Sequence, residues 1–238
     1  MKTPRASFVI PVFNGQAFLA ETIQSCLDQT QPRIEIIVVD DGSTDGTADI
    51  LTHFQYIDER VRVIRHEKNM GRSAARNTGI EAAQSDIIMT LDADDLCTED
   101  RAEKTIKFFK KNKTTDIVYS SCQNIDLLGD LIIFQDQQGN QIDTVPALPF
   151  DIEKVRKTLN TWIPCHSSMS FQKYVFEKVK YSEGEWSSHC IDDWRFQLDA
   201  WMAGFKFGTI PNVLVRYRYL PKKRDEEAIK KLKEAALA

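Results

Sequence analysis

The sequence contains few cysteines, and their pattern excludes two kinds of small, cross-linked fold. Five cysteines are spread over 238 residues with no Cys-x-x-Cys pair. An odd, scattered set of this kind fits neither a disulfide framework nor a zinc site, and it is typical of a reducing compartment. We therefore expect a cytoplasmic protein.

Long apolar runs and basic clusters are also missing from the sequence. A membrane-spanning helix needs ~20 consecutive apolar residues, whereas the first apolar run, at 7–13, is short and contains Pro11, as a strand would rather than a signal peptide. A net charge of −4 without a block of Lys and Arg argues against a nucleic-acid partner. Peripheral contact with a membrane stays open, because 221–238 has a mixed-charge helical pattern.

Two common phosphate-binding loops are absent. No Gly-x-x-x-x-Gly-Lys motif occurs, and no Gly-x-Gly-x-x-Gly motif follows the first apolar run. These absences argue against a Walker-type ATP site and against a dinucleotide site.

What is present is an alternation of apolar runs and helical patterns, which predicts an α/β fold. Apolar strands separated by helices of ten or more residues indicate a mainly parallel central sheet with helices on both faces. The predicted strands are 7–13, 34–40, 61–66, 86–92 and 116–125, and the predicted helices are 16–29, 45–57, 72–84 and 99–111.

The second half of the chain is less regular. We expect one domain over 1–220 followed by a helical tail at 221–238. The predicted elements are a hairpin at 132–143, a short helix after Phe150, a strand at 167–171, a helix at 192–203, and two strands, 205–210 and 213–219, around a turn at Pro211-Asn212.

Acidic residues gather where predicted strands end. Asp40 and Asp41 follow the second strand, and Asp92, Asp94 and Asp95 follow the fourth. Ser43 or Thr44, and Thr98, are available to cap the next helices, so the five carboxylates exceed what capping requires. Ligands of open α/β sheets bind beyond the carboxyl ends of the strands.

Such a cluster predicts a divalent cation. Two carboxylates 4 Å apart repel by ~4 kcal/mol at an effective dielectric constant of about 20, and oxygen ligands suit Mg²⁺ or Mn²⁺ bound together with substrate phosphates. Asp40 and Asp41 also suit a base with a ring N–H, such as uracil, thymine or guanine. Arg72 or Arg76, after Gly71, would contact phosphate or base, or lie on a solvated helix face.

Five motifs in this order and spacing resemble family 2 glycosyltransferases of the GT-A (Rossmann-like) fold. They are FVIPVFNG, IIVVDDGSTDGT, NMGRSAARNTG, LDADD and IDDWRFQLDAWMAGFKF, and the resemblance covers residues 6–220. It implies an inverting transfer of a sugar, with UDP-hexose or UDP-N-acetylhexosamine as the expected donor, to a saccharide or lipid-linked hydroxyl in cell-surface polysaccharide synthesis. It also implies a nucleotide-sugar-binding half, 1–115, and an acceptor-binding half, 116–220.

The resemblance assigns residues to roles. Asp94 is the implied direct metal ligand for Mn²⁺ or Mg²⁺, with Asp92 towards the ribose or a metal-bound water. Asp193 is the implied general base, beside Asp192. The implied nucleotide-sugar contacts are Pro11, Phe13, Asn14, Asp40, Asp41, Arg72, Asp92 and Ala93.

Two positions depart from the family pattern. Leu220 follows Tyr-Arg-Tyr where a histidine is frequent, which puts a third metal contact in doubt, and Asp192 stands where Glu is usual, which leaves the base assignment between Asp192 and Asp193 open. Two other functions stay open: a nucleotidyltransferase, although the sequence lacks its Gly-rich basic loop, and a non-catalytic nucleotide-sugar-binding module. The sequence predicts neither the sugar, the acceptor, the linkage nor the oligomeric state.

Overall fold

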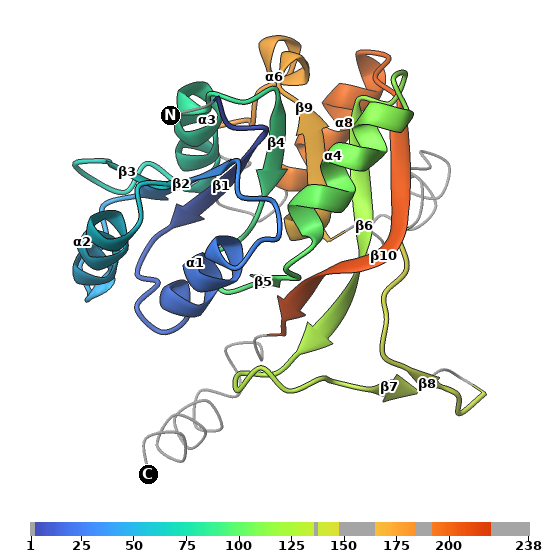
Figure 1. The fold of residues 1–238 in the computed structure, drawn as a ribbon, viewed down its shortest axis with the longest axis horizontal. Coiled ribbons are helices and arrows are strands. Elements are labelled where there is room, and N and C mark those ends of the chain that lie inside the picture. The colour runs from blue at the N-terminus through green and yellow to red at the C-terminus, as the bar shows by residue number, and fades with distance from the viewer. Residues whose placement is uncertain (1–2, 136–137, 148–164, 184–191, 220–238) are drawn as a thin grey trace.

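The computed structural model describes residues 3–135, 138–147, 165–183 and 192–219. Their strands form an eight-stranded sheet in the order β3-β2-β1-β4-β9-β6-β10-β5 and a separate hairpin, β7-β8. Figure 1 shows the hairpin standing away from the body of the molecule. The strands are β1 (Ala6–Val12), β2 (Ile34–Asp40), β3 (Val61–Arg65), β4 (Ile87–Thr90), β5 (Leu96–Cys97), β6 (Ile117–Ile125), β7 (Phe134–Gln135), β8 (Gln141–Ile142), β9 (Met169–Gln172) and β10 (Phe207–Arg218).

The sheet is mixed. β1 pairs in parallel with β2 and with β4, β2 with β3, and β6 with β10, whereas β9 lies antiparallel between β4 and β6. Because β1 has β2 on one side and β4 on the other, the chain reverses its direction of progression across the sheet at β1. Ligands of such sheets bind at this switch point.

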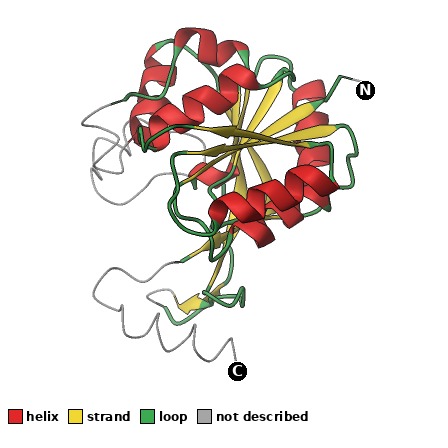
Figure 2. Ribbon diagram, turned by 90° about the vertical axis from the view of Figure 1, so that its left-hand side faces the viewer, coloured by secondary structure: helices red, strands yellow, loops and turns green. Residues whose placement is uncertain are grey.

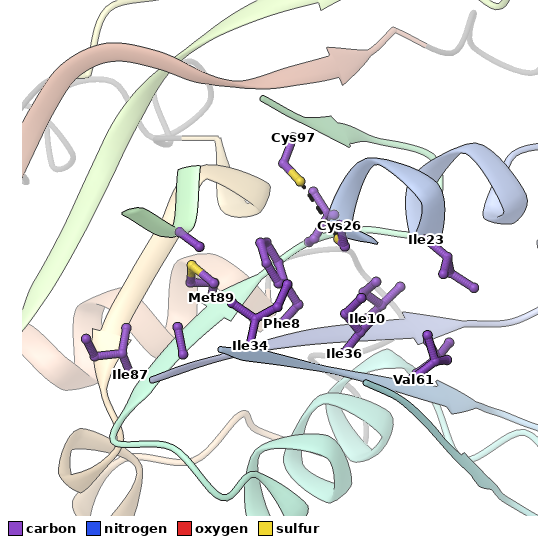
Figure 3. Close-up of a cluster of buried hydrophobic side chains, with 14 of the residues drawn as sticks. Phe8, Ile10, Ile23, Cys26, Ile34, Ile36, Val61, Ile87, Met89 and Cys97 are labelled. Atoms are coloured by element: carbon purple, nitrogen blue, oxygen red, sulfur yellow. Dashed lines mark hydrogen bonds between the residues drawn. The ribbon is translucent and has the colours of Figure 1, made fainter. Parts of the chain in front are cut away.

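Helices cover both faces of the sheet (Figure 2). On one face, α1, α2 and α4 pack over alternate strand residues such as Phe8, Ile10 and Ile36, and Figure 3 shows part of this core. On the other face, α3, α6 and α8 pack over the intervening residues, such as Val9 and Ile37. The helices are α1 (Leu19–Leu27), α2 (Thr47–Ile57), α3 (Arg72–Ala82), α4 (Arg101–Lys111), α6 (Tyr174–Lys178) and α8 (Asp192–Met202), with a 3-10 turn, η1 (His166–Ser168).

The predicted fold class is confirmed, with helices on both faces of a mainly parallel sheet. The prediction of two strands at 205–210 and 213–219 is wrong: β10 is continuous, and Pro211-Asn212 forms an irregularity in its pairing with β6 rather than a turn. A bulge accommodates a proline because its missing N–H leaves no ladder bond unmade. β5 was not predicted, because two residues give no periodic signal.

The expected helix caps are also wrong. α2 begins after Gly46 and α4 after Asp100, and neither of these two N-cap residues makes a side-chain hydrogen bond to its helix. The short helix predicted after Phe150, the tail at 221–238 and Leu220 lie outside the described residues. None of the described helices is long and apolar enough to cross a bilayer.

Candidate active site

A cleft of about 930 Å³ lies at the carboxyl ends of β1 and β4, a size typical of ligand sites. It brings together eight of the predicted site residues: Pro11, Phe13, Asn14, Asp41, Arg72, Asp92, Ala93 and Asp94. Asp41 and Asp94, from the ends of the second and fourth strands, therefore line one cleft, as the sequence predicted.

Asp41 joins two sides of this cleft. Its carboxylate accepts hydrogen bonds from the backbone N–H groups of Met70 at 2.9 Å and Gly71 at 2.8 Å, and Nδ1 of His66 lies 2.7 Å away. Gly42 makes the close approach possible: its φ is 74°, and a Cβ there would lie 2.7 Å from the carbonyl carbon of Lys68. The end of β2 thus fixes the loop that leads into α3.

Asn14 holds the neighbouring wall. It has a positive φ of 53°. Its Oδ1 accepts a hydrogen bond from the N–H of Thr44 at 2.8 Å, and its own N–H donates to Oγ of Ser43 at 2.9 Å. Phe13, beside it, is 48% exposed and offers a ring face to a base or sugar.

Asp40 does not line the cleft. It is buried, its Oδ1 accepts a hydrogen bond from the N–H of Ser43, and its Oδ2 lies 3.4 Å from Nε of Arg65. Its carboxylate holds the turn after β2, a structural role other than helix capping that the sequence does not reveal. A contact between Asp40 and a nucleotide stays a prediction.

The Asp92–Asp95 loop divides its carboxylates between the cleft and the interior. Asp92 and Asp94 line the cleft, whereas Asp95 is fully buried, accepting a hydrogen bond from the N–H of Arg218 at 2.7 Å and another from the hydroxyl of Ser167. Asp95 is therefore a structural acceptor and not a further carboxylate for an ion.

The two cleft carboxylates differ in their electrostatics. Burial and the nearby charge of Asp92 raise the pKa of Asp94 to about 6. Burial also opposes ionisation of Asp92, but the charge and hydrogen bond of Arg76, together with the charge of Arg72, contribute to a net lowering of the pKa of Asp92. Arg76 Nη2 donates to Asp92 Oδ1 at 2.8 Å. Arg76 thus stabilises the charge of Asp92, whereas the charge of Asp94 is unfavourable in its surroundings.

These residues fit a hard divalent ion. Both cleft carboxylates offer oxygen ligands, and the raised pKa of Asp94 marks a negative charge that a cation would stabilise. Within the described residues, no group of three or more His, Cys, Asp or Glu side chains is arranged around a metal position. An ion held here would therefore complete its coordination with phosphate oxygens and water, as Mg²⁺ commonly does.

The two candidates for the general base, Asp192 and Asp193, are the first residues of α8. Asp192 is 1% exposed, and its Oδ2 accepts hydrogen bonds from Arg76 Nη1 at 2.6 Å and Ser73 Oγ at 3.2 Å. Asp193 is half-buried, and neither residue is part of the cleft lining. Asp192 therefore fixes the helix start, which leaves Asp193 as the better candidate for a reacting group.

Comparison with known proteins shows the family to which the chain belongs. A model of glycosyl transferase family 2 matches residues 7–180. The chain belongs to glycosyl transferase family 2. The match includes the cleft-lining loops from β1 to β4, so the family and the geometry concern the same residues.

This family 2 member shares sequence with curated glycosyltransferases. It is 37% identical to an uncharacterized glycosyltransferase of Haemophilus influenzae over 145 residues, which are 61% of this chain and 54% of the relative. It is 35% identical to the chondroitin synthase of Escherichia coli over 131 residues, which are 55% of this chain and 19% of the synthase. The chain thus spans about half the length of the first relative and a smaller part of the second.

A solved structure shares the fold of this family 2 member. The chain superposes on Staphylococcus aureus TarS in complex with UDP-GlcNAc with a TM-score of 0.69 at 16% identity, covering 92% of this chain and 60% of TarS. The GT-A fold expected from the sequence motifs is confirmed.

Two arginines of this family 2 glycosyltransferase were not assigned from the sequence. Arg76 was left open beside Arg72, and it lies between Asp92 and Asp192. Arg218 is buried and donates to the carbonyl oxygens of Asp94, Asp126 and Leu127. The sequence does not predict the link from Arg76 to Asp192, which is 116 positions away. It does not predict the contacts of Arg218 either, because most of them are with backbone carbonyls.

Proposed function

We propose that the protein transfers a sugar from UDP-hexose or UDP-N-acetylhexosamine to a hydroxyl of a saccharide or lipid-linked acceptor, with inversion at the anomeric carbon. The proposal includes Mn²⁺ or Mg²⁺ as cofactor and cell-surface polysaccharide synthesis as context. The observation that carries it is a single cleft lined by a base-reading candidate, Asp41, and by the carboxylate pair Asp92 and Asp94.

The base end of the cleft supports a ring N–H donor. A carboxylate offers about four acceptor directions, and Met70, Gly71 and His66 occupy three of those of Asp41. One direction on Oδ2 would then remain for uracil N–H, and Phe13 lines the same cleft. An adenine base has no ring N–H on its pairing edge, so the contact favours a uridine nucleotide over an adenosine nucleotide.

The diphosphate end supports a cation. Asp94, with Asp92, would hold the divalent ion. Arg72 also lines the cleft, and its positive charge favours the ionised form of both carboxyls, although burial still leaves the pKa of Asp94 raised. When bound, the ion neutralises charge on the departing UDP. The halves 1–115 and 116–220 then serve donor and acceptor respectively.

Asp193 completes the reaction as general base. It takes the proton of the acceptor hydroxyl while that oxygen attacks the anomeric carbon from the face opposite UDP, and the bond from that carbon to the diphosphate oxygen breaks with its electrons leaving on UDP. A positioned base contributes about 10²–10⁴-fold. The relatives named above, a polysaccharide synthase and a structure with a bound UDP-sugar, support this class of donor and acceptor.

Product analysis tests the proposal. The protein is incubated with a panel of UDP-, GDP- and ADP-sugars, Mn²⁺ and oligosaccharide acceptors, and we expect UDP release, with NMR of the product showing inverted anomeric configuration. Pyrophosphate release would indicate a nucleotidyltransferase. Binding without release would indicate a non-catalytic module, and preference for an ADP-sugar would contradict the role of Asp41.

A further inference from the structure

One guanidinium connects the two sides of the proposed reaction. Arg76 lies in α3 and is 3% exposed. Its Nη2 donates to Asp92 Oδ1 at 2.8 Å, and its Nη1 donates to Asp192 Oδ2 at 2.6 Å. These two aspartates are separated by 100 positions in the sequence, and they belong to the donor cleft and to the first turn of α8.

α3 reinforces this connection with the residues around Arg76. Ser73 Oγ lies 3.2 Å from Asp192 Oδ2, one helical turn before Arg76. Asn77 exchanges two hydrogen bonds with the backbone of Tyr181, whose ring stacks on Phe196 of α8 at a centroid distance of 4.3 Å. One face of α3 therefore holds α8 from two directions.

The geometry requires arginine. A planar guanidinium presents separate N–H groups to two carboxylates at once, whereas a lysine ammonium is a single point charge on a flexible stem. The donor loop has a further anchor, because the N–H of Asp92 donates to Ser167 Oγ at 3.0 Å. Without Arg76, the backbone of Asp92 keeps its hydrogen bond to Ser167, whereas the buried Asp192 carboxylate keeps, among the contacts of the described residues, the longer one from Ser73 Oγ at 3.2 Å.

We propose that Arg76 is a positioning residue that fixes the first turn of α8, and with it Asp193, relative to Asp92. The inference rests on the proposed function, in which Asp193 is the base. Misplacement of a reacting group by about 1 Å costs about 10²-fold in rate. Arg76 also lines the cleft, but its two terminal nitrogens donate to Asp92 and Asp192. We therefore expect Arg76 to contribute more to kcat than to the affinity for UDP.

The test compares Arg76→Ala and Arg76→Lys with Arg62→Ala. Arg62 is a matched control, because it also joins a buried carboxylate to α3, with Nη1 2.6 Å from Glu35 Oε2 and 3.0 Å from the carbonyl oxygen of Ala82, and it does not line the cleft. For each variant we measure kcat, the Kd of UDP with Mn²⁺, and hydrogen exchange of the amides at the start of α8.

We expect Arg76→Ala to lower kcat by about 10²-fold while the Kd of UDP stays within about tenfold of wild type. Guanidinium ions at non-denaturing concentration should restore part of kcat, and urea should not. Exchange at the start of α8 should rise. Arg62→Ala should keep the wild-type kcat, gain nothing from guanidinium and leave α8 protected.

Arg76→Lys covers the case in which Arg76→Ala does not fold, because it keeps the charge and loses only the two-sided contact. Wild-type kcat in Arg76→Lys would overturn the inference, as would parallel loss of kcat and UDP affinity or an absence of guanidinium rescue in a folded Arg76→Ala protein. If wild type releases no UDP from any UDP-sugar, the proposed function fails instead, and hydrogen exchange still decides whether Arg76 holds α8.

Discussion

Asp94 and Asp95 are adjacent in sequence and have opposite surroundings. Asp95 is enclosed and takes hydrogen bonds from Ser167 and the backbone of Arg218, while Asp94 lines the cleft. The carbonyl oxygen of Asp94 accepts a hydrogen bond from Nε of Arg218 at 2.8 Å, so the backbone of the loop is held while the carboxylate stays available. Asp95 thus stabilises the loop, and the carboxylate of Asp94 is the candidate metal ligand.

Asp94 should reduce the stability of the metal-free protein. Its pKa is raised from the ordinary 3.8 to about 6, so the folded state binds this proton more tightly than the unfolded chain. The free energy of unfolding therefore decreases as pH rises through that interval. We expect Asp94→Asn to have a higher Tm than wild type in EDTA near neutral pH, with the gain lost at pH below 3.8.

Asp58→Asn is a control for which we expect the opposite change in Tm. The hydrogen bond from Arg60 lowers the pKa of Asp58, so its ionised form stabilises the fold above its unfolded pKa, and removing the charge should lower the Tm near neutral pH. A Tm of Asp94→Asn at or below that of wild type in EDTA would show that Asp94 carries no unfavourable charge.

At the scale of elements, α3 lies unusually close to the sheet because of one glycine. A Cβ at Gly79 would lie 2.6 Å from Cγ1 of Val9 and 3.1 Å from Cγ2 of Val39, and both valines are buried. This close contact sets the depth at which Arg72 and Arg76 meet the cleft.

Gly79→Ala should therefore destabilise the protein, although alanine favours helices. The helix preference gains about 1 kcal/mol, and overpacking a filled core costs about 1–3 kcal/mol. We expect a net loss in the free energy of unfolding, measured by urea denaturation. Glu81→Ala, on the exposed side of α3, is the control and should change it by less than about 0.5 kcal/mol. An increase for Gly79→Ala would mean that α3 does not pack this closely.

Elements were predictable to different degrees. The five apolar runs up to 125 give strands of the sheet. β2 and β4 are buried at every position, whereas β3, at the edge of the sheet, is partly exposed and contains Arg62 and Arg65. The irregularity at Pro211-Asn212 was taken for a turn, since a bulged strand and a hairpin share the same residue types. Asp45, and not Ser43 or Thr44, accepts the N–H of Thr47 at the start of α2, a choice between neighbouring residues that composition does not decide.

At the scale of the whole molecule, the two proposed halves share one sheet. β9, from the second half of the chain, inserts between β4 and β6, so the ends of β1, β2 and β4 and the start of α8 converge on α3. The position of the cleft could be predicted from the sequence, because parallel strands have their carboxyl ends at the same edge of the sheet. The buried links from Arg218 to three backbone carbonyls and from Arg76 to Asp192 could not be placed. They join segments 91 to 124 positions apart and 116 positions apart.

The central claim is that the ends of β2 and β4 form one site that binds a uridine nucleotide together with a divalent ion. Calorimetric titration of UDP into the protein tests this claim. We expect binding with Mn²⁺, a large loss of affinity in EDTA, a similar loss in Asp94→Asn, and weaker binding of ADP than of UDP. Equal UDP affinity with Mn²⁺ and with EDTA, unchanged by Asp94→Asn, would contradict it.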